Sequence, residues 1–201
     1  MPTWRNVSNF QCLFYDGALN LLDYLSSIYC DSKQSCTTAL MLSREIDRII
    51  EQSNSDGTGN EMDIKVVVIP CIGDNTYANR QMSSLNSHLG GKNRRLPAIL
   101  KPFDNSKKRS GKNGYFRFGE PDPAILKTFL EMSNEYGIYC DLLYGAPSWC
   151  LLFDQWTSSD VRSPLFGRQV MYVHSGGLEG VSSQMTRYKH KGLVNSNEVQ
   201  I

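Results

Sequence analysis

The chain has 201 residues, with 21 Lys and Arg against 20 Asp and Glu, a net charge of +1, and 40% hydrophobic residues. This balance excludes collagen-like, intrinsically disordered and strongly charged proteins. A chain of this length can bury roughly two thirds of its unfolded surface, so we expect one globular domain over residues 1–201. There is no apolar run of the ~20 residues that a membrane span needs and no secretory or acylation signal, so we expect a cytoplasmic protein that does not enter a membrane.

The cysteines are scattered along the chain and none stands in a C-x-x-C pattern. They are Cys12, Cys30, Cys36, Cys71, Cys140 and Cys150. Scattered cysteines in a chain without a secretory signal favour reduced thiols, and structural zinc sites show a ligand spacing that this chain lacks. We therefore expect reduced thiols and no metal.

In the first half of the chain, apolar residues recur at helical spacing over 17–27 and 37–52, and a short strand is expected at 28–31 between them. Residues 64–69 form the most apolar, β-branched run and predict a strand with both faces covered. The loop at 71–74 after it is interpreted as the cap of a helix over 75–88. Two polar stretches, 53–63 and the basic segment 86–114, are interpreted as loop insertions.

In the second half, Asp122-Pro123 is typical of a helix start and Gly137 of a helix end. Further elements follow in alternation: a strand over 138–143, a helix over 147–155, a strand over 169–173 and a helix from Gly177 onward. Repeated alternation of strand and helix predicts an α/β fold with a mostly parallel sheet and helices on both faces. Ligands of such sheets bind at the loops that leave the carboxyl ends of the strands.

Four of these loops could carry chemistry, although the loop 71–74 is better explained as a helix cap. The loop 32–38 offers hydroxyls and backbone N–H groups at a helix start, which suit a phosphate but are equally ordinary capping groups. Tyr144 leaves a predicted strand just before Gly145 and could be an acid, a base or a stacking partner, or a hydrogen-bonded core tyrosine. The loop 170–180 combines His174 and Ser175 with a Gly-Gly pair, which allows a backbone to approach an anionic or planar ligand closely.

Two motifs and their order resemble a known enzyme family. Tyr172-Val-His-Ser-Gly-Gly-Leu-Glu-Gly180 matches an apolar strand followed by His, Thr or Ser and Gly-Gly, and Gly137-Ile-Tyr-Cys-Asp-Leu-Leu-Tyr144 is similar to a Gly-Ile then Asp-Pro-Val-Tyr motif. The sequence resembles the C-terminal portion of the pyridoxal-phosphate-dependent 1-aminocyclopropane-1-carboxylate deaminases and D-cysteine desulfhydrases, of the tryptophan synthase beta-like fold. The resemblance spans roughly residues 17–193.

The resemblance implies a pyridoxal 5'-phosphate cofactor, a small amino acid as substrate, release of ammonia and a 2-oxo acid, and a homodimer. It implies Tyr144 as a catalytic residue that lies over the cofactor. It further implies two groups of cofactor-binding residues, the phosphate donors and the residues that line the pyridine ring. The expected donors are Ser35, Cys36, Thr37 and Thr38, and the expected lining residues are His174, Ser175, Gly176 and Gly177.

The chain departs from the family pattern at the lysine that attaches the cofactor. In the family this lysine lies in an Asn-Lys-x-Arg-Lys motif within an N-terminal portion that the resemblance does not cover. Lys92 stands in a similar local sequence, but it lies in the wrong part of the fold, beside Arg94 and Arg95 in the basic segment. The alternative interpretation is therefore a noncatalytic relative or an incomplete fragment of such an enzyme.

A third interpretation is nucleic-acid binding through the basic segment. Phe103, Tyr115 and Phe116 would stack on bases. Its basic residues are Lys92, Arg94, Arg95, Lys101, Lys107, Lys108, Arg109 and Lys112. A net charge near zero gives no wider basic surface, so we do not expect nucleic acid to be the partner.

Overall fold

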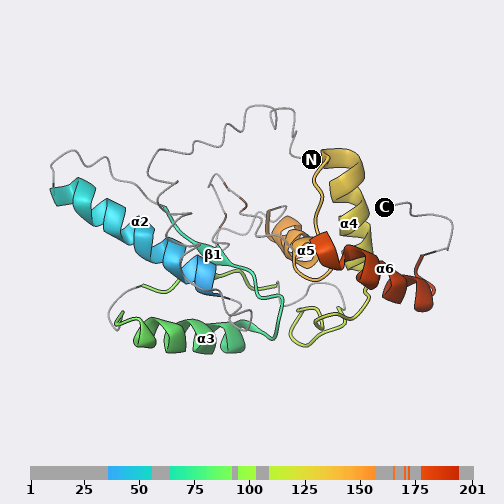
Figure 1. Cartoon of the computed structure of the whole chain (residues 1–201), viewed down its shortest axis with the longest axis horizontal. Helices are drawn as coiled ribbons and strands as arrows, with labels where there is room; N and C mark the ends of the chain where they lie inside the picture. The colour runs from blue at the N-terminus through green and yellow to red at the C-terminus, as the bar shows by residue number, and fades with distance from the viewer. Residues whose placement is uncertain are drawn as a thin grey trace. The chain divides into compact units, whose positions relative to one another are not determined.

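The computed structural model describes residues 36–55, 64–91, 95–102, 109–156, 165, 170, 172 and 178–194 (Figure 1). The helix expected at 17–27 and the strand at 28–31 lie outside these residues. The chain divides into two compact units. The first unit holds the described residues up to 67 and those of 80–98, and the second holds 68–79 and those from 99 onward.

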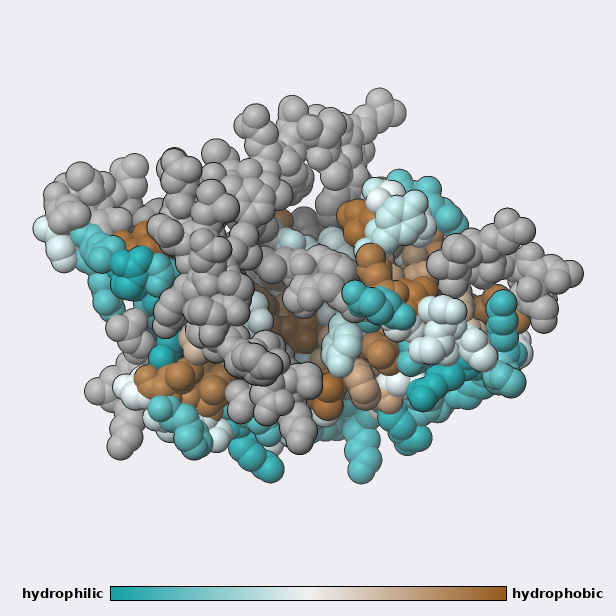
Figure 2. All heavy atoms as spheres, in the orientation of Figure 1, coloured by the Kyte–Doolittle hydropathy of each residue, from teal (hydrophilic) through white to brown (hydrophobic). Residues whose placement is uncertain are grey.

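Helix α2 (Thr37–Ser55) confirms the amphipathic helix expected over 37–52. Its apolar side is buried at Leu40 and Met41, while hydrophilic side chains gather over its exposed part (Figure 2). Within the first unit, the Arg44 guanidinium donates to the Asn86 side-chain oxygen at 2.9 Å and to the Leu89 carbonyl at 3.2 Å. These bonds tie α2 to the end of the next helix.

Strands β1 (Val67–Val68) and β2 (Ala98–Ile99) form a two-stranded parallel sheet. The Ala98 N–H donates to the Val66 carbonyl, and the Leu100 N–H donates to the Val68 carbonyl, each at 2.9 Å. The strand is shorter than the expected 64–69, and the prediction that both its faces are covered is wrong at Ile64, which is 51% exposed. Because β2 lies within 86–114, part of the segment interpreted as a loop is sheet.

Helix α3 (Asn75–His88) has the bounds that the sequence predicts. Asp74 caps it, because its carboxylate accepts the Tyr77 N–H at 2.9 Å. The interpretation of the loop 71–74 as a helix cap is therefore confirmed. Gly73 stands before the cap with φ +73°, a conformation that glycine adopts at little cost.

Helix α4 (Pro123–Tyr136) begins and ends as the sequence predicts. The Asp122 carboxylate accepts the Ala124 N–H at 2.9 Å. Gly137 ends the helix with φ +64°, and its N–H donates to the Met132 carbonyl. Asp122 also accepts the Ser110 N–H at 3.1 Å, so this cap fixes the preceding loop as well as the helix.

The strand expected over 138–143 is wrong. Residues 138–141 have no regular structure, residues 142–144 form a turn, and Tyr139 is 72% exposed. The reason is local: the Asp141 carboxylate accepts three backbone N–H groups that follow it, which folds this segment into the start of helix α5 (Gly145–Trp156). A Cβ on Gly145 would lie 2.7 Å from Cβ of Cys140, so this close turn requires glycine.

Helix α5 is the core of the second unit and packs against α4. Every residue from Ala146 to Leu152 is buried. Beside it, Arg109 forms an ion pair with Asp154, and its side chain is only 1% exposed. The guanidinium also donates to the Gly114 carbonyl at 2.7 Å and lies 5.1 Å from the centre of the Phe116 ring. One base of the basic segment is therefore part of the core.

The C-terminal part of the described chain contains the 3₁₀ helix η2 (Leu178–Gly180) and helix α6 (Val181–His190), where the sequence predicts a helix. Tyr188 is 1% exposed, and its hydroxyl accepts the Asp122 N–H at 3.3 Å. Of the strand expected over 169–173, the structure describes Val170 and Tyr172, and neither is in a strand.

Candidate functional site

The turn that carries Tyr144 is held by one buried carboxylate. Asp141 is 2% exposed. Its Oδ1 accepts the N–H groups of Leu143 and Tyr144 at 2.7 and 2.6 Å, and its Oδ2 accepts that of Gly145 at 2.9 Å. The backbone N–H groups at a helix start have no intrahelical acceptor, so Asp141 both caps α5 and fixes the backbone of Tyr144.

Tyr144 is not a core tyrosine, because it is 44% exposed. Its ring lies 5.5 Å from that of Phe118, which is 43% exposed, at an interplanar angle of 51°. Partial burial, the Asp141 charge and Cys71 raise the pKa of the phenol. The hydroxyl is therefore protonated near neutral pH, and its residue belongs to a turn held by three hydrogen bonds to Asp141, with an exposed aromatic neighbour.

Cys71, which the sequence analysis did not assign to this site, lies beneath the same turn. Its Sγ is 3.2 Å from Oγ of Ser148 and donates to the Tyr144 carbonyl at 3.5 Å. Tyr172 adjoins this group: its ring lies 4.6 Å from that of Trp149, and burial, followed by the neighbouring Cys71, strongly raises the pKa of its phenol. The second unit thus brings together Cys71, Tyr144, Ser148 and Tyr172.

The start of α2 belongs to the first unit. Cys36 is buried, and burial raises the pKa of its thiol, whereas Thr37 is half-buried and Thr38 is exposed. The first N–H groups of an α-helix and its dipole both favour an anion, so this part of the predicted phosphate loop retains the chemistry that a phosphate needs. Ser35 and the predicted ring-lining residues His174, Ser175, Gly176 and Gly177 lie outside the described residues.

Each lysine in the described part of the chain is exposed. They are Lys65, Lys101, Lys112, Lys127, Lys189 and Lys191. A lysine that holds pyridoxal phosphate must reach the cofactor aldehyde and lose its proton, which burial promotes. The described residues include no buried lysine that could attach the cofactor.

The nucleic-acid interpretation loses two of its stacking residues. Tyr115 is 3% exposed and Phe116 is 7% exposed, so neither ring can receive a base. Arg109 is in the core. Phe103 lies outside the described residues, and the exposed bases that remain in the described part of this segment are Arg95, Lys101 and Lys112.

The described residues contain no group of His, Cys, Asp and Glu that could hold a metal ion. Among the same residues, no helix combines the length and apolarity needed to cross a membrane. Cys36, Cys71, Cys140 and Cys150 stand as thiols rather than disulfides. A scan against protein-family models and a search of curated proteins found no match to the chain.

Proposed function

We propose that this chain binds pyridoxal 5'-phosphate and takes part in the deamination or desulfhydration of a small amino acid, as its resemblance to the deaminase and desulfhydrase family implies. The presentation of Tyr144 supports this proposal most. A protonated phenol, 44% exposed, stands on a turn that the buried Asp141 carboxylate fixes through three hydrogen bonds. A group that moves a proton has to be held in this way within reach of a substrate.

The residues have separate roles in this proposal. Pyridoxal phosphate, when bound, supplies an electron sink for the substrate, while the protein binds, orients and exchanges protons. The family resemblance assigns the cofactor phosphate to the N–H groups at the start of α2, with Thr37 and Thr38. Tyr144 would hold or transfer a proton at its hydroxyl, and Cys71 with Asp141 would keep its backbone in place. The tryptophan synthase beta-like fold, the homodimer and the cytoplasmic location belong to the same proposal.

The second candidate is a relative that binds the cofactor without catalysis, because the family's lysine motif lies outside the part of the family that the chain resembles. Without a lysine at the site, the cofactor would be held by its phosphate and ring alone. Turnover would then be absent although binding persists. The two candidates differ in one measurable property, the formation of a covalent adduct at a single lysine.

The test is a titration of the purified chain with pyridoxal phosphate, followed by borohydride reduction and peptide mapping. Ammonia and 2-oxo acid release from D-cysteine and 1-aminocyclopropane-1-carboxylate are measured in parallel. A saturable adduct at one lysine with turnover supports the enzyme. Saturable binding without adduct or turnover supports the noncatalytic relative. A chain that does not bind pyridoxal phosphate contradicts both.

Tyr144→Phe tests the assigned residue. It keeps the ring against Phe118 but removes the hydroxyl, so we expect cofactor affinity within about twofold of the wild type and turnover lower by about 100-fold or more. Tyr139→Phe is the matched control, because Tyr139 is 72% exposed and lies in the same loop. Equal turnover of the two variants would contradict the role of Tyr144.

A further inference from the structure

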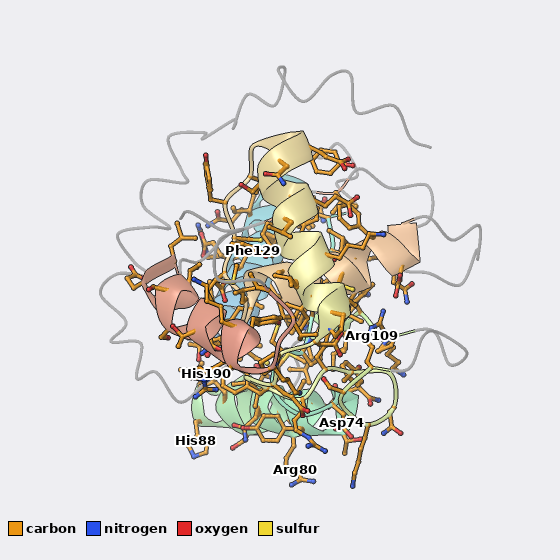
Figure 3. All side chains as sticks on the ribbon, turned by 90° about the vertical axis from the view of Figure 1, so that its right-hand side faces the viewer. Asp74, Arg80, His88, Arg109, Phe129 and His190 are labelled. Carbon is orange, nitrogen blue, oxygen red and sulfur yellow. The ribbon has the colours of Figure 1, made fainter. Side chains whose placement is uncertain are left out.

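A second candidate site lies in the second unit, between the loop before α4 and the last turn of α6. It is a shallow depression of about 520 Å³ that is widely open to solvent. Its lining residues are Gly119, Glu120, Pro121, Arg187, His190 and Lys191. Figure 3 shows His190 at the end of α6.

The charges that line this pocket are unbalanced. Glu120 is the single acid among the lining residues, and Lys191 is paired with it at 3.1 Å. Outside the pocket lining, Arg117 also lies 3.1 Å from the Glu120 carboxylate. The hydrogen bond from Lys191 and the nearby cations lower the pKa of Glu120, so this acid is ionised at neutral pH. Lys191 and Arg117 therefore already neutralise the charge of Glu120, without any contribution from Arg187.

Arg187 is held at the pocket wall by a neutral group. Its Nη1 donates to the Gly119 carbonyl at 3.1 Å, and no carboxylate in the described part of the chain lies within ion-pair distance of its guanidinium. One turn later, neither ring nitrogen of His190 has a hydrogen-bond partner among those residues. Residues three apart on a helix lie on the same face, so both side chains present unused donors to one pocket.

We infer that this pocket binds the phosphate group of a small phosphorylated ligand. The planar guanidinium can donate two parallel hydrogen bonds to phosphate oxygens, and His190 and Lys191 supply further donors on the same helix end.

The alternative explanation is that these bases only offset the negative end of the dipole of helix α6. Cations near a C-terminus interact favourably with the helix dipole, and Lys189 on the same turn is exposed and outside the pocket lining. The dipole does not explain why Arg187 is fixed by the Gly119 carbonyl of another segment. It also does not explain why Lys191 donates to both Glu120 and the Pro121 carbonyl, at 3.1 and 3.3 Å.

The site is independent of the proposed function, and its test uses inorganic phosphate as the probe. Phosphate is titrated at low ionic strength, and binding is followed by calorimetry and by amide chemical shifts. We expect Arg187→Gln to weaken phosphate binding about tenfold, and Lys127→Gln, which removes an exposed lysine of α4, to leave it unchanged. Glu120→Gln should strengthen binding about threefold, because it removes the only acid that lines the pocket.

Gly119→Ala tests the geometry without removing a charge. Gly119 has φ +72°, and an added Cβ would lie 3.3 Å from Nη1 of Arg187. We expect weaker phosphate binding with an unchanged circular dichroism spectrum. Pyridoxal phosphate affinity is measured in parallel: because the two sites are separate, Arg187→Gln should leave it unchanged, and a loss would place the cofactor phosphate at this pocket instead of at the start of α2. Absence of phosphate binding at low salt, or equal weakening by Lys127→Gln, overturns the inference.

Discussion

Asp141→Ala should destabilise the second unit more than any single surface change. The substitution removes an acceptor from three backbone N–H groups at the start of α5. Hydrogen bonds to a charged group contribute about 1.5–3 kcal/mol each, whereas loss of a helix N-cap costs about 0.5–2 kcal/mol. Because the three bonds share one carboxylate and the exposed Tyr144 lets water reach the turn, we expect a total loss of about 3–4 kcal/mol.

Urea unfolding followed by tryptophan fluorescence measures this loss. With a denaturant slope of about 2 kcal/mol per molar, the midpoint should fall by roughly 1.5–2 M. Asp141→Asn retains one acceptor oxygen and should lose about half as much stability. Glu135→Gln, at an exposed position of α4, should change stability by less than about 0.5 kcal/mol. An Asp141→Ala midpoint within about 0.3 M of wild type would refute this account of the turn.

Three further predictions use other parts of the structure. Gly145→Ala should lower the free energy of unfolding by about 2 kcal/mol through crowding. Gly137→Ala, which has open space around it, should lower it by only the ~1 kcal/mol that a left-handed backbone costs. Equal urea midpoints of the two variants would contradict this. Burial raises the pKa of Tyr115 and Tyr188 to about 12 and also raises those of the buried thiols. As the pH rises, the unfolded chain loses these protons before the folded chain does, so the free energy of unfolding should fall from about pH 9 upward. Unfolding midpoints that stay constant to pH 11 would contradict this prediction. Maleimide should label Cys71 before the buried thiols, as peptide mapping of a short exposure would show, and earlier labelling of any buried cysteine would disprove this order.

The helices were predictable because their signals are local. The α4 helix begins at Asp122-Pro123 and ends at Gly137, and each of these residues acts through its own backbone or its immediate neighbours. Apolar spacing alone was enough for α2, and α3 begins and ends where predicted.

The expected strand over 138–143 failed because Asp141 competes for the same backbone. Its apolar composition is that of a strand, but the carboxylate captures the Leu143 N–H within the expected strand and the Tyr144 and Gly145 N–H groups directly after it. Strand β2 was missed for the opposite reason. It is a two-residue pairing within a basic, proline-containing segment, and only its distant partner makes it a strand.

Much the same limit applies to the candidate site. Tyr144 could be singled out as a candidate because its motif is contiguous, whereas Cys71 and Ser148 are 77 residues apart and meet only in the folded chain. The pocket at Arg187 gave no sequence signal, because its bases also serve as ordinary residues of a helix end.

The burial of Arg109 has a consequence for counterions. A base that neutralises a phosphate of nucleic acid releases condensed ions, and the salt dependence of binding counts such bases. The Arg109 side chain is 1% exposed and paired with Asp154, so it cannot bind a nucleic-acid phosphate and release a condensed ion. Any polyanion that touched the segment 86–114 would therefore show a shallower salt dependence than eight bases predict. The same arginine links the segment to α5, so deleting 86–114 would remove a strand and a core ion pair rather than trim a surface loop.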